Sequence, residues 1–117
     1  LAAAAGISDT VIGLTVVAVG TSLPELATSF VAALRKQSDI AYGNIIGSNI
    51  FNVLGIAGVT ALTQPIAIPS QIVSFDLPVM IGATLLVAVF ATTGSRLSRM
   101  EGAALLSGYA AHLLVIV

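Results

Sequence analysis

The sequence predicts an all-α integral membrane protein with about four transmembrane helices and the end of a fifth. Hydrophobic residues make up 57% of the chain and charged residues only 8%, whereas a soluble domain has about 25% charged residues. The apolar runs are long enough to supply the ~20 residues that a helix needs to cross a ~30 Å hydrocarbon core. Leu1 opens directly on an alanine run with no charged segment before it, so we expect a fragment of a longer protein.

The first predicted elements are the tail of one helix and the whole of the next. Gly6 follows the alanine run and suits the position after a helix end, where a left-handed conformation is common. Ser8 or Asp9 can cap the following helix, because a side-chain oxygen there accepts from free backbone N–H groups. That helix is predicted from about residue 10 to 34, and a polar loop follows over residues 35–39.

Three more helices are predicted after this loop, each an apolar run bounded by polar residues or prolines. Asp39, Asp76 and Glu101 lie near predicted helix starts, where a carboxylate favours the positive end of the helix dipole. Pro78 falls in a first turn, where a missing N–H costs little. The elements in chain order are helix 40–62, connector 63–75, helix 76–93, loop 94–99 and helix 100–117.

The basic residues predict which loops are cytoplasmic. All of them fall in the loops at 35–39 and 94–99, and connector 63–75 has neither Lys nor Arg. Cytoplasmic loops of membrane proteins carry an excess of basic residues, so we expect these two loops to be cytoplasmic. The residues concerned are Arg35, Lys36, Arg96 and Arg99.

The first polar cluster interrupts the first long apolar run with the sequence Gly-Thr-Ser-Leu-Pro-Glu, residues 20–25. An ionisable residue such as Glu25 at that depth marks a functional site. Ser22 and Glu25 have capping-box spacing, so we expect a break between Gly20 and Pro24 that frees carbonyls near Ala18. Hydroxyls, freed carbonyls and a carboxylate are hard oxygen ligands that suit Na⁺ or Ca²⁺.

The second polar cluster lies in the next predicted helix. Asn44, Ser48 and Asn52 follow one another at four-residue spacing and form one polar stripe, and we expect an irregular helix near residues 47–49. Small residues at 43 and 47 allow another helix to approach closely. Two alternatives stay open, namely that Glu25 only caps a half-helix and that the stripe only joins helices. Thr15, Thr28, Ser29 and His112 are interpreted as structural, with a proton relay as the alternative for His112.

Together the two clusters resemble the α-repeat of the cation/calcium exchanger superfamily, most closely its prokaryotic sodium/calcium exchanger branch. The matching stretches are residues 20–25 and 43–52, and the resemblance covers about residues 11–62. It implies two inverted repeats of five helices, each giving two broken helices to a central ion site. The implied ligands are the side chains of Thr21, Ser22, Glu25, Ser48 and Asn52 and the backbone carbonyl of Ala18.

The resemblance and the position of loop 35–39 imply that residues 1–117 are a single membrane-domain fragment, the C-terminal repeat. The implied function is half of a secondary antiporter that exchanges Ca²⁺ for Na⁺ by alternating access, with these ions as cargo and without an organic cofactor. The partners would be the N-terminal repeat of the same parent or a second copy, within a bacterial or archaeal inner or plasma membrane. Alternatives are a Ca²⁺/H⁺ exchanger and a non-transporting scaffold half. We expect neither an enzyme nor a nucleic-acid partner, because the sequence offers no nucleophile–base pair and no basic patch.

Overall fold

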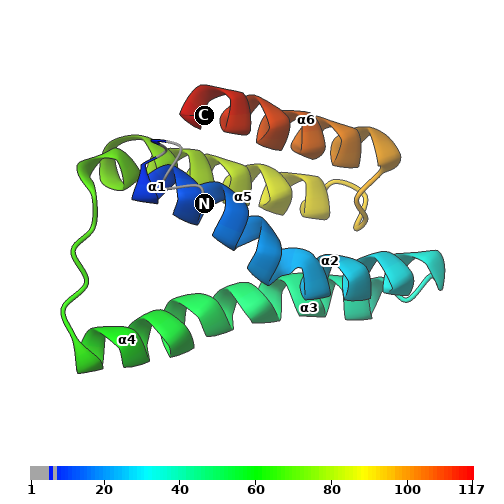
Figure 1. The fold of residues 1–117 in the computed structure, drawn as a ribbon. Coiled ribbons are helices and arrows are strands. Elements are labelled where there is room, and N and C mark those ends of the chain that lie inside the picture. The colour runs from blue at the N-terminus through cyan, green and yellow to red at the C-terminus, as the bar shows by residue number, and fades with distance from the viewer. Residues whose placement is uncertain (1–5, 7) are drawn as a thin grey trace. The chain divides into compact units, whose positions relative to one another are not determined.

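The computed structural model describes residue 6 and residues 8–117, and every regular element in them is helical. The chain divides into two compact units, Leu1–Ala67 and Ile68–Val117, which are described one at a time (Figure 1). Gly6 has a φ of +76°, the left-handed conformation expected after a helix end. The helix tail predicted before Gly6 lies outside the described residues.

The first unit opens with a continuous helix of 26 residues, Asp9–Leu34. Ser8 is its N-cap, as one of the two predicted candidates, and its Oγ accepts from the N–H of Val11 at 3.3 Å. A π-helical segment interrupts the α-helical pattern, and at its end the N–H of Ala18 donates to the carbonyl of Gly13, five residues back. The three parts are α1 (Asp9–Ile12), the π segment η2 (Gly13–Val17) and α2 (Ala18–Leu34).

The predicted break between Gly20 and Pro24 is wrong, because α2 runs through both residues. Ser22 and Glu25 therefore lie inside the helix and form no capping box. A proline removes one backbone donor, and membrane helices tolerate this loss when hydroxyls bond nearby carbonyls. Near the proline, the hydroxyl of Thr21 bonds the carbonyls of Val17 and Ala18. The observed irregularity is the π segment, which ends before the polar cluster begins.

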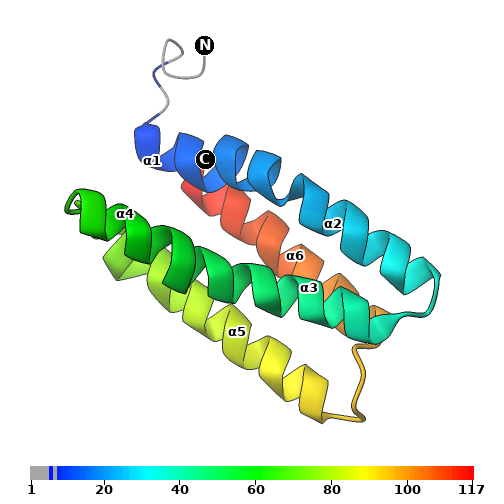
Figure 2. The same ribbon diagram turned by 90° about the horizontal axis from the view of Figure 1, so that it is seen from below.

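A tight turn joins the two long helices of the first unit. Lys36 has a φ of +58°, and its N–H donates to Ala33 O, while the N–H of Gln37 donates to Ala32 O at 2.8 Å. These two bonds make a Schellman motif, which satisfies the last carbonyls of α2. The turn packs α2 against α3 (Ser38–Ile50), and the two helices separate away from it (Figures 1 and 2).

The second long helix of this unit is also continuous over 26 residues, Ser38–Thr63. It contains α3, the π segment η3 (Phe51–Ile56) and α4 (Ala57–Thr63). The predicted irregularity near residues 47–49 is thus displaced to the following turns, and Asn52 lies inside it. There the N–H of Ala57 donates to the carbonyl of Asn52, five residues back.

The second unit contains two helices. After the non-helical residues 64–69 the chain becomes helical at Ser70, earlier than predicted, and continues through η4 (Ile72–Asp76) into α5 (Leu77–Thr92). Asp76 is therefore inside the helix, so its predicted role as a cap at the helix start is wrong. After the turn, α6 (Arg99–Ile116) runs back along α5 (Figure 1).

The start of α6 confirms the predicted role of Glu101 as a helix-capping residue. The N–H of Ser98 donates to Glu101 Oε2 at 2.7 Å, and the N–H of Glu101 donates to Ser98 Oγ at 3.3 Å. The two bonds form a complete capping box, which satisfies two N–H groups that a helix start leaves free.

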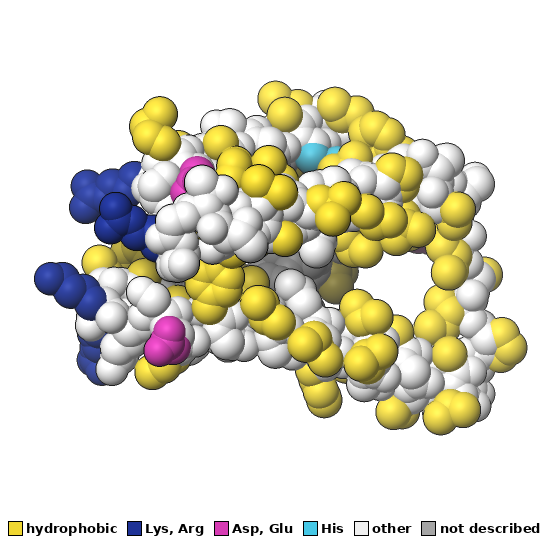
Figure 3. Space-filling view, turned by 180° about the vertical axis from the view of Figure 1, so that it is seen from behind, with side chains coloured by type: hydrophobic (Ala, Val, Ile, Leu, Met, Phe, Trp, Pro, Cys, Tyr) yellow, Lys and Arg dark blue, Asp and Glu magenta, His cyan; other side chains and the backbone are white. Residues whose placement is uncertain are grey.

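The exposed apolar surface of these helices indicates that they lie in a membrane. Three of them are long and apolar enough to cross a membrane: Asp9–Leu34, Ser38–Thr63 and Ile72–Thr92. Among the described residues, Ala32 is the only buried apolar side chain, and large apolar side chains cover the helices of each unit (Figure 3). Such surfaces are stable in lipid rather than in water. The all-helical membrane class is therefore supported, with three helices long and apolar enough to span and α6 as a further helix.

Candidate cation site

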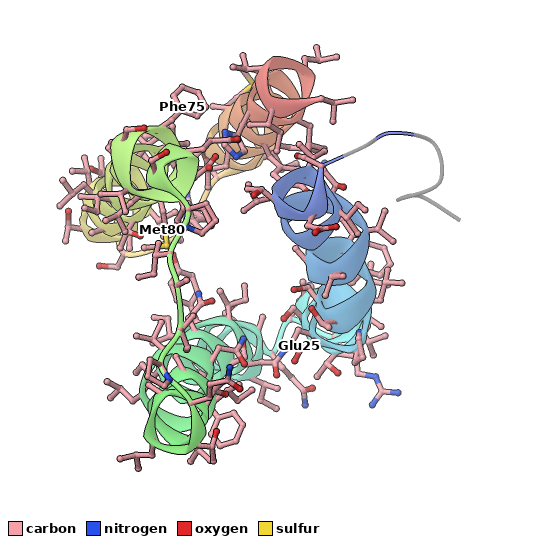
Figure 4. All side chains as sticks on the ribbon, turned by 60° about the vertical axis from the view of Figure 1, so that its left-hand side comes forward. Glu25, Phe75 and Met80 are labelled. Carbon is pink, nitrogen blue, oxygen red and sulfur yellow. The ribbon has the colours of Figure 1, made fainter. Side chains whose placement is uncertain are left out.

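The polar cluster of the first unit centres on Glu25, which lies on α2 where α2 meets α3 (Figure 4). Its side chain is half-buried, and its Oε2 atom is buried without a hydrogen-bond partner in the described residues. A buried carboxylate oxygen without a partner is unfavourable. Glu25 therefore has an unused acceptor that a cation can occupy.

Asn44 joins α3 to α2 beside Glu25. Its Nδ2 donates to the backbone carbonyl of Glu25 and to Ser29 Oγ, both at 3.0 Å. Within the part of the chain that the structure describes, these are the only side-chain hydrogen bonds that connect two helices. They fix how α3 lies against the turn of α2 that carries the carboxylate. Asn44 was predicted as part of the polar stripe but not as a residue of the site.

The other predicted ligands of α2 share one face with Glu25. Because α2 is continuous, Ala18, Thr21, Ser22 and Glu25 follow the i, i+3, i+4, i+7 spacing that places residues on one side of a helix. The Thr21 hydroxyl donates to the carbonyls of Val17 at 2.9 Å and of Ala18 at 3.1 Å. The side chain of Ser22 is exposed. The predicted oxygens thus form a line along the helix.

The predicted ligands of the second cluster are less closely assembled. Ser48 Oγ donates to Ile45 O at 3.1 Å, within its own helix, and Asn52 is exposed in η3. Neither side chain forms a hydrogen bond to α2 within residues 8–117, and the two helices separate with distance from their turn (Figures 1 and 2). The structure therefore connects Asn44, but not Ser48 or Asn52, by hydrogen bonds to the α2 residues around Glu25.

The predicted close helix approach at the glycines does not occur within this unit. A Cβ atom added at Gly20, Gly43 or Gly47 would meet no described atom within 4 Å. Both polar clusters therefore have an open face beside them, although small residues are typical of helix contacts in membranes.

Two hydroxyls that were predicted to be structural are confirmed as such. Thr15 Oγ1 donates to Val11 O at 2.6 Å, and Thr28 Oγ1 donates to Pro24 O at 2.9 Å. Each bonds a carbonyl of the preceding turn, as hydroxyls in helix interiors commonly do. Ser29 differs, because it accepts from Asn44 on the neighbouring helix.

A second pair of ionisable groups, in the other unit, was missed at the level of sequence. Asp76 is only 7% exposed, and His112 Nε2 lies 3.6 Å from its Oδ1 atom. Asp76 was taken for a helix cap because the helix was predicted to start there. Pro69 was the available signal for an earlier start, since proline is favoured in the first turn of a helix.

Comparison with known proteins agrees with a membrane protein. The sodium/calcium exchanger protein family matches residues 1–117, so the chain belongs to the sodium/calcium exchanger family. It is 46% identical over 111 residues to the sodium/calcium exchanger MaX1 of Methanosarcina acetivorans, covering 95% of this chain and 32% of that protein. It is 46% identical over 107 residues to the putative antiporter CaxA of Alkalimonas amylolytica, covering 89% of this chain and 34% of that protein.

A third relative is the inner membrane protein YrbG of Escherichia coli, 44% identical over 115 residues, covering 96% of this chain and 34% of that protein. The chain thus spans about a third of the length of these curated relatives. No solved structure matches the chain. The expectation that the chain belongs to the exchanger family and resembles its prokaryotic members is therefore confirmed.

Proposed function

We propose that this chain is the C-terminal repeat of a secondary antiporter that exchanges Ca²⁺ for Na⁺ by alternating access. Family membership and the names of the relatives support cation exchange as the class of function. The observation that carries the proposal is the unpartnered, buried Oε2 of Glu25. It lies on the same helix face as the hydroxyls of Thr21 and Ser22, whereas the carbonyl of Ala18 is not freed, because α2 is continuous there and Thr21 Oγ1 donates to it. Such oxygens suit Ca²⁺ and Na⁺.

The proposed exchange needs no chemical step, because both ions would use the same oxygens. Glu25 would supply the negative charge, and Asn44 would hold the turn that carries it against α3. Ser48 and Asn52 would complete the ligand set of this repeat when the helices close around an ion. Ion sites of secondary transporters commonly form where two repeats meet near the middle of the membrane.

A second repeat is required by the number of ligands. Ca²⁺ takes about 6–8 oxygen ligands, and not all oxygens along one helix face can reach a single ion. A Cβ atom added at Gly43 or Gly47 would meet no described atom within 4 Å, so α3 has room for a neighbouring helix. The proposed partner is the N-terminal repeat of the same parent, with a second copy of this chain as the alternative.

Replacing Glu25 tests the site in the full-length protein that contains this chain. Glu25→Gln keeps the shape of the side chain but removes its charge, so Ca²⁺ uptake into reconstituted vesicles should fall to background. A divalent ion in a site of low dielectric constant depends strongly on that charge. Ser22→Ala keeps the carboxylate and should retain transport with a weaker Ca²⁺ affinity.

Glu101→Gln is the matched control, because it makes the same chemical change in the capping box of α6. It should leave transport unchanged. Near-normal Ca²⁺ exchange by Glu25→Gln, at equal expression and melting temperature, would remove Glu25 from the site. Loss of transport in both variants would show that the measurement reports folding instead.

The identity of the counter-ion separates this proposal from Ca²⁺/H⁺ exchange, in which Glu25 would take up a proton. A proton can neutralise the unpartnered carboxylate as well as Na⁺ can, so the alternative rests on the same atom. Vesicles loaded with Na⁺ at equal pH on both sides should drive Ca²⁺ uptake. Uptake driven only by a pH gradient would favour the alternative, and binding without transport would favour a scaffold half.

We also propose that the loops at 35–39 and 94–99 are cytoplasmic, since they contain all four basic residues. The chain has no cysteine, so single cysteines can be introduced at Gln37 and Gln64, which lie at opposite ends of the helix Ser38–Thr63. An impermeant thiol reagent added outside cells should label Gln64→Cys and not Gln37→Cys. The opposite pattern would reverse the orientation.

A further inference from the structure

Asp76 and His112 form an ionisable pair that the proposed exchange at Glu25 does not use. Asp76 is 7% exposed, and neither of its carboxylate oxygens has a hydrogen-bond partner among the described residues. The Nε2 atom of His112, on α6, lies 3.6 Å from Asp76 Oδ1. Phe75 stacks on the imidazole at a centroid distance of 5.9 Å with 17° between the rings, and Figure 4 shows it between the two helices.

Charged groups elsewhere in this unit are too distant to neutralise Asp76. Arg99 and Glu101 lie in the first turn of α6, and His112 follows Arg99 by 13 residues, or about 20 Å of helix. Arg96 lies in the turn beyond the far end of α5. Tyr109 is one helical turn from His112 but is 45% exposed and carries no charge in its ordinary state. Within residues 68–117, His112 is therefore the only group that can balance the carboxylate.

We propose that Asp76 and His112 together bind one proton, which they share between Oδ1 and Nε2. With this proton the pair is neutral overall, either as imidazolium with carboxylate or as imidazole with carboxylic acid. Either form supplies a hydrogen that can close the 3.6 Å gap to a hydrogen bond. Without the proton, the pair would hold a buried carboxylate with no counter-charge, which is the more costly state.

Proton binding has a structural consequence in this unit. Asp76 belongs to the segment that leads into α5, and His112 belongs to α6. The shared proton therefore links the two helices through a hydrogen bond. This site is separate from Glu25, and its existence does not depend on the transported ion.

The test uses the ring nitrogens of His112, which is the only histidine of the chain. In the full-length protein, ¹⁵N-histidine NMR signals of His112 are identified by their loss in His112→Gln. At a fixed pH near neutrality, the wild-type spectrum should show either an imidazolium with both ring nitrogens protonated or an Nε2 that accepts a hydrogen bond from the carboxylic acid. Asp76→Asn should lose this signature. Glu101→Gln, an acid-to-amide change at the far end of the same helix, should leave it unchanged. A neutral ring that carries its hydrogen on Nε2 and donates it to an ionised Asp76 would overturn the proposal.

A second measurement follows the proton when histidine is removed. In His112→Gln, Asp76 alone must keep the proton, so infrared spectra should gain the C=O band of a buried carboxylic acid. That band should be missing in the double variant with Asp76→Asn. An unchanged His112 signal in folded Asp76→Asn would overturn the proposal. So would a His112 signal that responds to Na⁺ at constant pH only when Asp76 is present, because the pair would then bind a metal cation.

Discussion

Asn44 should stabilise the packing of α3 on α2 through its bond to Ser29. Asn44→Ala removes two side-chain hydrogen bonds, to Glu25 O and to Ser29 Oγ. At about 0.5–1.5 kcal/mol each, the expected loss is about 1–3 kcal/mol of unfolding free energy. Only the bond to Ser29 can be removed from the other side by a substitution, so a double-mutant cycle isolates it.

The cycle combines Asn44→Ala and Ser29→Ala and measures unfolding in mixed micelles with increasing detergent denaturant. Side-chain hydrogen bonds between membrane helices have coupling energies of about 0.6 kcal/mol on average and at most about 1.7 kcal/mol, and we expect a value in that range. Thr28→Ala is the matched control, because the neighbouring hydroxyl bonds Pro24 O within its own helix. Its coupling to Asn44 should be near zero. Equal coupling for Thr28 and Ser29 would refute the bridging role of Asn44.

Two further predictions concern the ends of the helices. Lys36→Gly should raise the unfolding free energy by up to about 1 kcal/mol, because glycine adopts the φ of +58° without strain. Arg35→Gly removes the same charge at a φ of −84°, so it should give no such gain, and equal effects would point to charge instead of conformation. Glu101→Ala should cost on the order of 1 kcal/mol because it opens the capping box. Thermal unfolding measures this loss, which Glu101→Gln should largely avoid.

Helix positions could be predicted from the sequence because each apolar run is long and bounded by polar residues. The run that ends at Leu34 and the run that starts at Ile40 are separated by the predicted loop 35–39. The structure places the turn there, with α3 beginning already at Ser38. Helix starts were harder to predict. The connector after Thr63 was extended to residue 75, whereas the chain is helical again from Ser70. That error assigned Asp76 to a helix end and hid its contact with His112.

The two Ser-x-x-Glu patterns show why local sequence does not determine a cap. Ser98 and Glu101 form a capping box, while Ser22 and Glu25, with the same spacing, lie inside α2. Ser98 follows a polar turn in which Gly94 has a φ of +83°, so the residues directly before Ser98 are not helical. Ser22 follows an apolar run that is already helical, and one proline is too weak a signal to end that helix in a membrane.

The candidate site was predicted in composition but not in geometry. The polar residues of α2 fall on one face, as helix periodicity requires, yet which residue of α3 meets them depends on the angle between two helices. That angle follows from the turn at Lys36 and from the bonds of Asn44, which join residues far apart in sequence. The π segments have no comparable sequence signal, because large apolar residues are spread around these helices and a one-residue shift in their periodicity is not visible.

The π segment η3 would allow one part of the second long helix to rotate about the helix axis while the rest stays in place. Its bond from Ala57 N to Asn52 O spans five residues, so this turn holds one residue more than an α-helical turn. If the extra residue moved along the helix by one turn, the side chains it passed would rotate by about 100° around the axis, the angle per residue of an α-helix. Backbone bonds would exchange one for one, and both ends of the helix would stay in place. Asn52 could therefore face a different neighbour while the helix as a whole kept its position in the membrane.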